Sequence, residues 1–409
     1  MLAVLRRRDF SFLWLAGLVS MAGDWVLMAA LPYVVYVRTD SVLATAGMVA
    51  AELAPSILLS SFAGVFVDRW DRRRLLVVTN LLQALTVTAL LLVGDGSLWV
   101  VYVVAAVQSA VASFSQPAES ALLPSLVPVE ELVPANALNV LNNRIGRLVG
   151  TPLGAVLLGL GGLHLVVVVD ALSFLGAAAL VAAMTASAPR PRTDRLAIDE
   201  AETAFRRFWA EWVAGLRIVR EDRTIAMLFV VFGLMTFGGT MLDPLFVPWV
   251  RDVLGEGVWA VALLMTTSSL AGIAGSLVVG SLGNRVPAWA LIGWSSLLAG
   301  LLLLAKFNIP VVWVAVALSA VGGVTAVASS VGVETLAQER TPEHLRGRVF
   351  GSLQATVWLM SLLGAVVGGI VGEAVGVLPA LHLASVLVGV SGVVVLVLAR
   401  DRSSYGTDR

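Results

Sequence analysis

Long apolar runs, separated by short polar and charged stretches, extend along the whole chain. A helix needs about 20 mostly apolar residues to cross a bilayer, and twelve runs are long enough. Barrel strands are shorter than these runs, and an open sheet edge cannot satisfy its backbone hydrogen bonds in lipid. The pattern therefore predicts an all-α integral membrane protein with twelve transmembrane helices. The runs are 10–37, 42–67, 75–94, 97–122, 134–160, 163–186, 224–250, 257–283, 287–306, 309–336, 346–373 and 376–399.

The distribution of charge supports this topology. Only 13% of the residues are charged and 58% are hydrophobic, whereas a soluble globular protein carries about 25% charged residues. Of the 27 Lys and Arg residues, only Arg38, Arg251 and Lys306 fall in one set of loops, and the other 24 fall in the opposite set. Because cytoplasmic loops are enriched in Lys and Arg, we expect both termini to be cytoplasmic in a multi-pass protein of the inner (plasma) membrane.

A polar segment between the sixth and seventh runs divides the chain into two halves. Within this segment, Phe205, Phe208, Trp212 and Val219 recur at helical spacing, which predicts an amphipathic helix lying on the inner membrane surface. We expect this helix to tether two six-helix bundles. The predicted domains are an N-terminal bundle (1–186), a cytoplasmic linker (187–223), a C-terminal bundle (224–400) and a cytoplasmic tail (401–409).

The two halves resemble each other in sequence. Matching positions occur in the same order at offsets of 215 to 218 residues. Such matches indicate two copies of one six-helix unit in the same orientation, as in transporters built from parallel repeats. The second copy lacks the acid that follows the second run. The matches are Gly64, Asp68 and Arg69 with Gly280, Asn284 and Arg285, Glu119 with Glu334, and Gly146 and Gly150 with Gly364 and Gly368.

Several motifs carry a family resemblance that covers essentially the whole chain. The stretch "GVFVDRWDRRRLL" (64–76) resembles the loop 2–3 signature G-x-x-x-D-R-x-G-R-R of the major facilitator superfamily, with Asp71 where Gly is common. The stretches "PAESALLPSLVPVEELVPANAL" (117–138) and "DALSF" (170–174) resemble the drug:proton antiporter branch that includes macrolide-efflux and siderophore-export proteins. The resemblance implies a secondary transporter of two bundles that works by alternating access.

Three intramembrane acids are candidates for proton coupling or substrate binding. Asp24 lies about 21 Å from the cytoplasmic start of the first run, and Glu52 lies about 16 Å from the outer start of the second, so both fall near the midplane. Burial favours the neutral form of a carboxyl group, so an acid there can take up and release a proton, and it can attract a cationic substrate when ionised. Asp170 lies about 10 Å below the outer surface. A hydrogen bond between helices is the alternative for each of them.

The charged stretch after the second run has two interpretations. Its Arg residues hold the loop in the cytoplasm. Asp68, at the cytoplasmic end of the second run, can face the N-terminus of a neighbouring helix or an Arg across the seam between the halves. The resemblance further implies that this loop latches the two halves in the outward-open state, with Gly64 packed against the eleventh run. The candidates for that Arg, by order along the chain, are Arg346 and Arg348.

The same latch involves basic residues of the loop and acids of the fourth and tenth runs. The resemblance implies that Arg69 or Arg72, beside Arg73, pairs with Glu119 near the cytoplasmic end of the fourth run. Glu334 would be its counterpart near the end of the tenth. These positions favour gate partners over proton sites.

Small residues form a stripe on the fifth run. Gly146, Gly150 and Gly154 recur every four residues, which lets a neighbouring helix approach closely, and Pro152 can bend the same helix. The segment "GRLVGTPLGA" (146–155) resembles the antiporter signature G-x-x-x-G-P-x-x-G-G, with Thr151 inserted and Ala155 at the last position. Plain helix packing and a mobile contact both fit the stripe.

The favoured function is proton-coupled efflux of lipophilic or amphipathic small molecules, of a multidrug or macrolide-like kind. An uptake symporter or a siderophore or lipid transporter of the same fold is the alternative, and a membrane enzyme or a receptor is a third class. Lys306 is the one Lys of the chain and lies in no G-x-x-x-x-G-K motif, and no catalytic motif occurs. With no Cys and three His, we expect no metal and no cofactor. The expected partners are a small-molecule substrate, protons and the lipid bilayer, without nucleic acid, for a protein working as a monomer.

Overall fold

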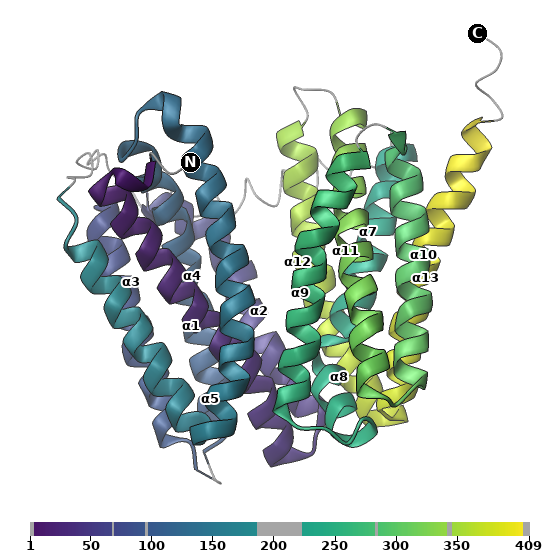
Figure 1. Cartoon of the computed structure of the whole chain (residues 1–409), viewed down its shortest axis with the longest axis horizontal. Helices are drawn as coiled ribbons and strands as arrows, with labels where there is room; N and C mark the ends of the chain where they lie inside the picture. Colours follow the sequence, from purple (N-terminus) through teal and green to yellow (C-terminus); the bar gives the residue numbers. More distant parts are fainter. Residues whose placement is uncertain are drawn as a thin grey trace. The chain divides into compact units, whose positions relative to one another are not determined.

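The computed structural model describes residues 4–67, 69–94, 97–185, 223–282, 285–341 and 346–403. Every regular element in these ranges is helical (Figure 1). Eleven helices in the described ranges are long and apolar enough to cross a membrane. The predicted all-α class is therefore confirmed, while the count of twelve spans and the side on which the termini lie stay predictions. The predicted linker helix falls outside the described residues.

The described residues divide into two compact units, each with its own internal contacts. The first unit holds residues 4–39 and 51–185, and the second holds residues 40–50 and 223–403. In the first unit, α1 packs against α5, and α3 packs against both α4 and α5. The first half of the chain forms the helices α1 (Arg8–Thr39), α2 (Val42–Val67), α3 (Arg72–Thr88), α4 (Trp99–Leu122) and α5 (Leu132–Ala182).

In the second unit, α10 packs against α11 and α13, α9 packs against α11, and α7 packs against α12 and α13. Short 3-10 turns and one π-helical turn, η5 (Trp249–Val253), complete the described structure. The helices are α7 (Arg223–Met241), α8 (Asp243–Pro248), α9 (Val258–Leu282), α10 (Ala288–Asn308), α11 (Val312–Arg340), α12 (Arg346–Val375) and α13 (Val377–Ser403).

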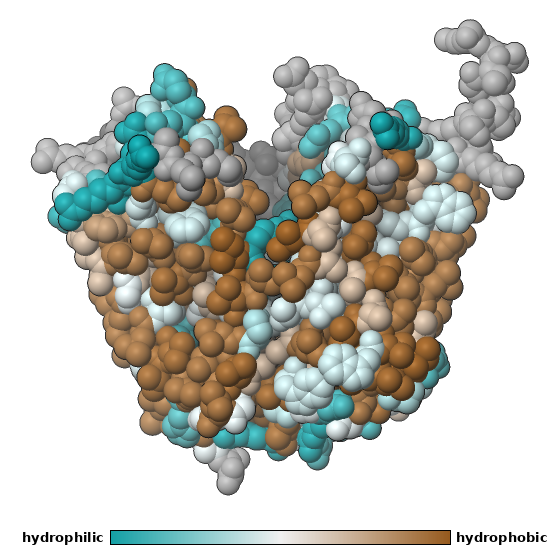
Figure 2. Space-filling model, in the orientation of Figure 1, coloured by the Kyte–Doolittle hydropathy of each residue, from teal (hydrophilic) through white to brown (hydrophobic). Residues whose placement is uncertain are grey.

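Large apolar side chains cover the outer faces of the helices. Leu160, Leu277 and Trp313 are 77%, 74% and 67% exposed. On the face shown in Figure 2, hydrophobic side chains lie along the helices and hydrophilic ones gather at their ends. Exposed apolar surface of this extent marks contact with lipid.

The longest helix, α5, contains one break. At Gly162 the backbone has φ 63° and ψ −163°, which is not helical, so two helical segments meet there. This region of conformational space is open to glycine and closed to residues with a Cβ. The break lies between the fifth and sixth predicted spans, which end at 160 and begin at 163.

The start of α2 belongs to the second unit. Ser41 Oγ and the backbone N–H of Leu43 both donate hydrogen bonds to Glu373 Oε2, each at 3.1 Å. Arg251 Nη1 lies 2.6 Å from Asp40 Oδ1. Because a carboxylate at a helix N-terminus satisfies free N–H groups, Glu373 anchors this end of α2 to α12. By their contacts, residues 40–50 therefore group with the second unit.

Asp71 is the N-cap residue of α3. Its side chain accepts a hydrogen bond from the backbone N–H of Arg74 at 3.0 Å, and its backbone is extended, as an N-cap requires. The family signature has Gly at this position. The departure from the signature thus supplies a helix cap.

Replacing Asp71 with Ala is expected to lower the free energy of unfolding by about 1 kcal/mol, because the cap is lost. Asp71→Ser, which keeps an acceptor oxygen, should stay close to the wild type. Thermal unfolding of the purified protein in detergent measures both. Equal stability of the Ala and Ser variants would contradict a capping role.

Candidate functional site

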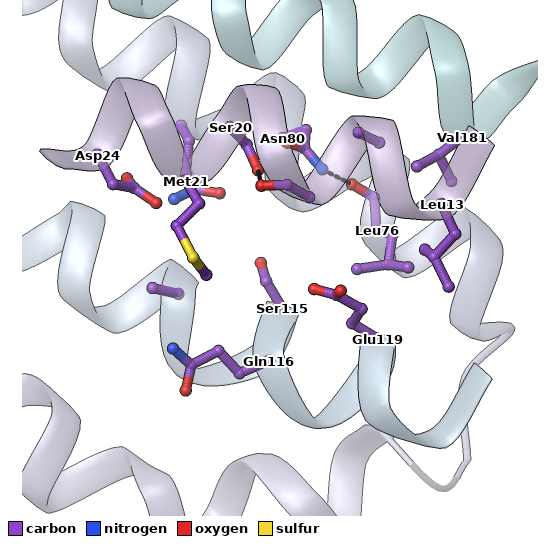
Figure 3. A pocket seen from close by; sticks show the side chains of 14 residues that line it. Leu13, Ser20, Met21, Asp24, Leu76, Asn80, Ser115, Gln116, Glu119 and Val181 are labelled. Atoms are coloured by element: carbon purple, nitrogen blue, oxygen red, sulfur yellow. Dashed lines mark hydrogen bonds between the residues drawn. The ribbon is translucent and has the colours of Figure 1, made fainter. Parts of the chain in front are cut away.

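A small cavity lies among α1, α3, α4 and the end of α5 in the first unit (Figure 3). Its volume is about 70 Å³, which is room for several water molecules. Two of its lining residues are acids, Asp24 and Glu119, and Figure 3 shows them separated along the cavity, with Ser115 and Met21 in the space between. The other lining residues are Leu13, Ala16, Gly17, Ser20, Leu76, Asn80, Gln83, Ala112, Gln116 and Val181.

Asp24 is the acid that α1 contributes. Its side chain is exposed to the cavity. Within the described ranges no hydrogen bond or ion pair joins it to another residue. It lies within electrostatic range of both Glu52 and Asp170. Asp24 is therefore near both of the other acids proposed from the sequence, and it is the one of the three that lines the cavity.

Asp170 lies on the second segment of α5 and is fully buried. Its Oδ1 accepts a hydrogen bond from Ser173 Oγ at 3.3 Å, and its Oδ2 has no hydrogen-bond partner among the described residues. A Cβ on Gly23 of α1 would overlap the side chains of Asp170 and Ser173. Gly23 therefore allows α1 to carry Asp24 close to a second, half-satisfied carboxyl group.

Glu119, expected from the sequence as a gate partner of Arg69 or Arg72, is the acid that α4 contributes to the cavity. Its Oε1 lies against Gly17, where a Cβ would come within 3.2 Å of it. In the part of the chain that the structure describes, Glu119 forms no ion pair. Arg72 Nη1 donates to the carbonyl oxygen of Ala121 at 2.9 Å. The pairing of Glu119 with Arg69 or Arg72 stays a prediction.

The Arg residues at the start of α3 join neighbouring helix ends. Besides the contact of Arg72 with α4, Arg73 donates from Nε to the carbonyl of Val181 at 3.2 Å and from Nη2 to the carbonyl of Ala182 at 2.5 Å. Cationic donors stabilise the free carbonyls at a helix C-terminus. Part of the charge cluster thus holds α3 to α4 and α5.

The latch proposed from the sequence is only partly described. Asp68 lies outside the described residues, as do the surroundings of Gly64 in α2 and the side chains of Arg346 and Arg348 at the start of α12. Arg69 follows α2 and is partly buried. The latch therefore stays a prediction.

The Gly stripe of α5 packs against the segment of α1 that carries Asp24. A Cβ on Gly146 would come within 3.0 Å of Met21 Cγ, and one on Gly154 within 2.5 Å of the Val26 carbonyl oxygen. At Gly150 it would overlap the carbonyl of Ala22. These glycines let two backbones meet and so fix the height and direction of Asp24. Pro152, predicted to bend this helix, lies inside α5 within the stripe.

The second unit repeats this packing. A Cβ on Gly364 or Gly368 of α12 would overlap the backbone of α7. The stripe of small residues therefore forms a close helix contact in both halves of the repeat.

Among the described residues, no atom outside the backbone of α9 lies within 4 Å of a Cβ built on Gly280, and Glu334 and Arg285 are exposed. Asn284 lies outside the described residues. A closer contact on α9 is at Gly275, whose Cβ would come within 2.9 Å of Val324 Cα on α11.

Arg147 is one of the 24 basic residues that we expected in the cytoplasmic loops. It lies inside α5, 15 residues after Leu132, or about 22 Å along the axis. Its guanidinium lies 4.9 Å from the ring centroid of Trp25, next to Asp24 in sequence. A cation at this depth is unusual and commonly functional. Arg147 falls within the fifth apolar run (134–160), and this position in the sequence indicates a place inside the helix.

Lys306 was also counted in a loop, and it lies buried in the last turn of α10. Its Nζ is 5.1 Å from the ring centroids of both Phe246 and Trp249 and 5.7 Å from that of Phe307. Within the described residues no acid pairs with it. Three aromatic faces therefore stabilise the ammonium group.

Replacing Trp249 with Ala is expected to lower the free energy of unfolding by about 3 kcal/mol, because the ring is fully buried and also covers Lys306. The matched control is Trp313→Ala, at a position that is 67% exposed, which should change stability by less than about 0.5 kcal/mol in detergent. Denaturant titration of both variants tests the difference. Equal losses would contradict the role of this aromatic cluster.

An all-helical, multi-span membrane protein with an acidic cavity inside one helical unit has the features of a secondary transporter. The sequence profile of the Major Facilitator Superfamily matches residues 13–292 and 228–408. The chain belongs to this family of membrane transporters, and it lies in the inner (plasma) membrane as a multi-pass protein.

Individual relatives agree with this assignment. Macrolide efflux protein A of Streptococcus pyogenes is 23% identical over 375 residues, covering 90% of each chain. Multidrug efflux pump Tap of Mycobacterium bovis is 25% identical over 381 residues, covering 88% of this chain and 86% of the pump. The crystal structure of a bacterial homologue of the iron transporter ferroportin has a TM-score of 0.74 at 17% identity, covering 95% of this chain and 98% of the other. That last likeness concerns the fold alone.

Proposed function

We infer that the protein is a proton-coupled exporter of lipophilic or amphipathic small molecules that works by alternating access. The observation that carries this proposal is the cavity in the first unit, where Asp24 faces open space without a hydrogen-bonding partner among the described residues. Two relatives named as efflux proteins support export as the direction.

Asp24 has the chemistry needed to couple a substrate to a proton. An unpaired carboxylate in an apolar interior is costly, so it is neutralised either by a proton or by a cationic group. The nearby carboxylate of Glu52 disfavours a further negative charge at this place. Binding of substrate and binding of proton then compete, which is the minimum requirement for antiport.

The contact between α1 and α5 can couple the exchange of proton and substrate at Asp24 to a movement of α1. The Gly stripe at Gly146, Gly150 and Gly154 lets the backbone of α1 slide or pivot at short range, and Pro32 interrupts the hydrogen bonding of α1 beyond Asp24. We expect neutralisation of Asp24 to change the position of α1. We further propose that Asp68 and its neighbours form a cytoplasmic gate. We also propose that the protein works as a monomer.

Uptake, or transport of a siderophore or lipid, would use the same cavity and differ in direction and ligand. Transport into inside-out membrane vesicles, with a panel of lipophilic compounds and with or without a pH gradient, separates these cases. Export predicts accumulation in the vesicles that rises with an interior-acidic gradient and collapses when the gradient is dissipated. Accumulation that ignores the gradient would remove proton antiport.

A further inference from the structure

The Arg residues at the end of the first unit where α1 begins divide into two groups. Arg7 forms an ion pair with Glu131 at 2.6 Å, and the first two residues of α3 donate to carbonyls of α4 and α5. Arg8 and Arg74 are exposed, and within the described ranges no hydrogen bond or ion pair joins either guanidinium to another residue. These two cations are therefore available to a ligand.

Arg74 lies at the start of an exposed apolar stripe on α3. Val78, Leu81 and Leu85 follow it on the same helical face, and all three are exposed, Leu85 by 69%. The opposite face of α3 lines the internal cavity with Leu76, Asn80 and Gln83. The stripe therefore faces away from the interior of the unit, and an exposed apolar face of a membrane-spanning helix contacts acyl chains.

Arg8 has the same relation to α1. Leu15 and Val19, two and three turns further along, are exposed and lie on the helical face that Arg8 occupies. Arg8 Cζ lies 5.2 Å from the ring centroid of Phe12, one turn further along α1. The guanidinium therefore leans along the helix toward the apolar stripe, which places its charge at the boundary between polar and apolar surroundings.

The end of α5 joins the starts of these two helices. Thr185, just beyond α5, donates from its backbone N–H and from Oγ1 to the carboxylate of Asp9, at 2.9 and 3.0 Å. Arg73 donates to two carbonyls in the last turn of α5. Because Asp9 and Arg73 are the chain neighbours of Arg8 and Arg74, both exposed cations lie around one helix end, at the same end of the unit.

We propose that this end of the first unit binds anionic phospholipids of the surrounding membrane, such as phosphatidylglycerol. Arg8 and Arg74 each bind the phosphate of a headgroup, and the acyl chains lie along the stripes of α1 and α3. A guanidinium fits phosphate oxygens with two parallel hydrogen bonds, and a basic side chain next to a membrane surface attracts anionic lipid. A zwitterionic headgroup lacks the net charge that this arrangement favours.

The test is native mass spectrometry of the purified full chain in detergent, titrated with phosphatidylglycerol or with phosphatidylcholine of the same acyl chains. The wild type should bind phosphatidylglycerol about fivefold more tightly than phosphatidylcholine. The double variant Arg8→Gln and Arg74→Gln should lose this preference and keep its affinity for phosphatidylcholine, because the apolar stripes are unchanged. The double variant Arg8→Lys and Arg74→Lys, which keeps both charges, should retain the preference.

Arg340→Gln is the matched control. Arg340 is exposed at the end of α11, but Leu336 and Val333, which share its helical face, are buried, so no lipid-facing stripe adjoins it. This variant should bind both lipids as the wild type does. Equal affinity of the wild type for the two lipids, or a preference that survives the double Gln substitution, would overturn the proposal.

A competition with inorganic phosphate separates a lipid from a soluble anion. Phosphate at the concentration of the lipid should leave the binding of phosphatidylglycerol unchanged, because it lacks the acyl chains that the stripes contact. Displacement of the lipid by phosphate would assign the two Arg residues to a soluble anion and overturn the lipid site. The measurement involves no transport, so its failure would leave the proposed export untouched.

Discussion

Replacing Asp24 with Asn is expected to reduce pH-gradient-driven export to the level of vesicles that lack the protein, while the chain still inserts and folds. The substitution keeps the size of the side chain and removes its ability to exchange a proton. Because Asp24 is exposed to the cavity and unpaired among the described residues, its loss leaves no broken ion pair in that region. Ethidium accumulation in inside-out vesicles, normalised to protein content, measures the effect.

Asp252→Asn is the matched control for this experiment. Asp252 is 46% exposed and lies 4.0 Å from Arg251 in the second unit, so this variant should transport as the wild type does. Export by Asp24→Asn that still rises with the pH gradient would contradict the role of Asp24. Loss of insertion would instead assign Asp24 to folding.

A second large effect is expected at the contact between α1 and α5. In Gly150→Ala, the added Cβ would overlap the carbonyl of Ala22 and come within 2.6 Å of Trp25 Cβ. Backbone atoms cannot move aside as a flexible side chain can, so α1 must shift and carry Asp24 with it. We expect a loss of about 2 kcal/mol in stability together with a strong loss of export.

Gly159→Ala on the same helix is the control, since no described atom outside the nearby backbone of α5 lies within 4 Å of a Cβ built there. This variant should keep both transport and stability, because Ala is the better helix former. Thermal unfolding in detergent and vesicle transport give the two measurements. Equal transport and equal thermal stability of the two variants would show that the close contact at Gly150 contributes neither to export nor to stability.

The sequence predicted best those features that depend on the backbone, namely the helices and their close contacts. Apolar runs predicted the helical class, and the spacing of Gly146, Gly150 and Gly154 predicted a close helix contact, which the structure places against α1. Periodic small residues reveal such a contact because only a missing Cβ permits it. The partner helix was not predictable, since packing order is a tertiary property.

The sequence was least informative about the direction of single side chains. Arg147 and Lys306 lie within helices, although both were expected in loops. Glu119 lines the cavity, which its position near a helix end did not predict, and its pairing with Arg69 or Arg72 stays a prediction. The positive-inside rule concerns numbers of Lys and Arg, and it cannot identify the exceptional cation that aromatic rings stabilise. Partners distant in sequence, Trp25 for Arg147 and Phe246 and Trp249 for Lys306, determine those positions.

The proposed mechanism requires substrate and proton to move in opposite directions through Asp24. Purified protein in liposomes that contain a trapped pH indicator tests this directly, with an ethidium gradient as the only driving force. The account predicts a proton flux opposite to the movement of ethidium, present in the wild type and absent in Asp24→Asn. Ethidium movement with no change in internal pH in the wild type would contradict it.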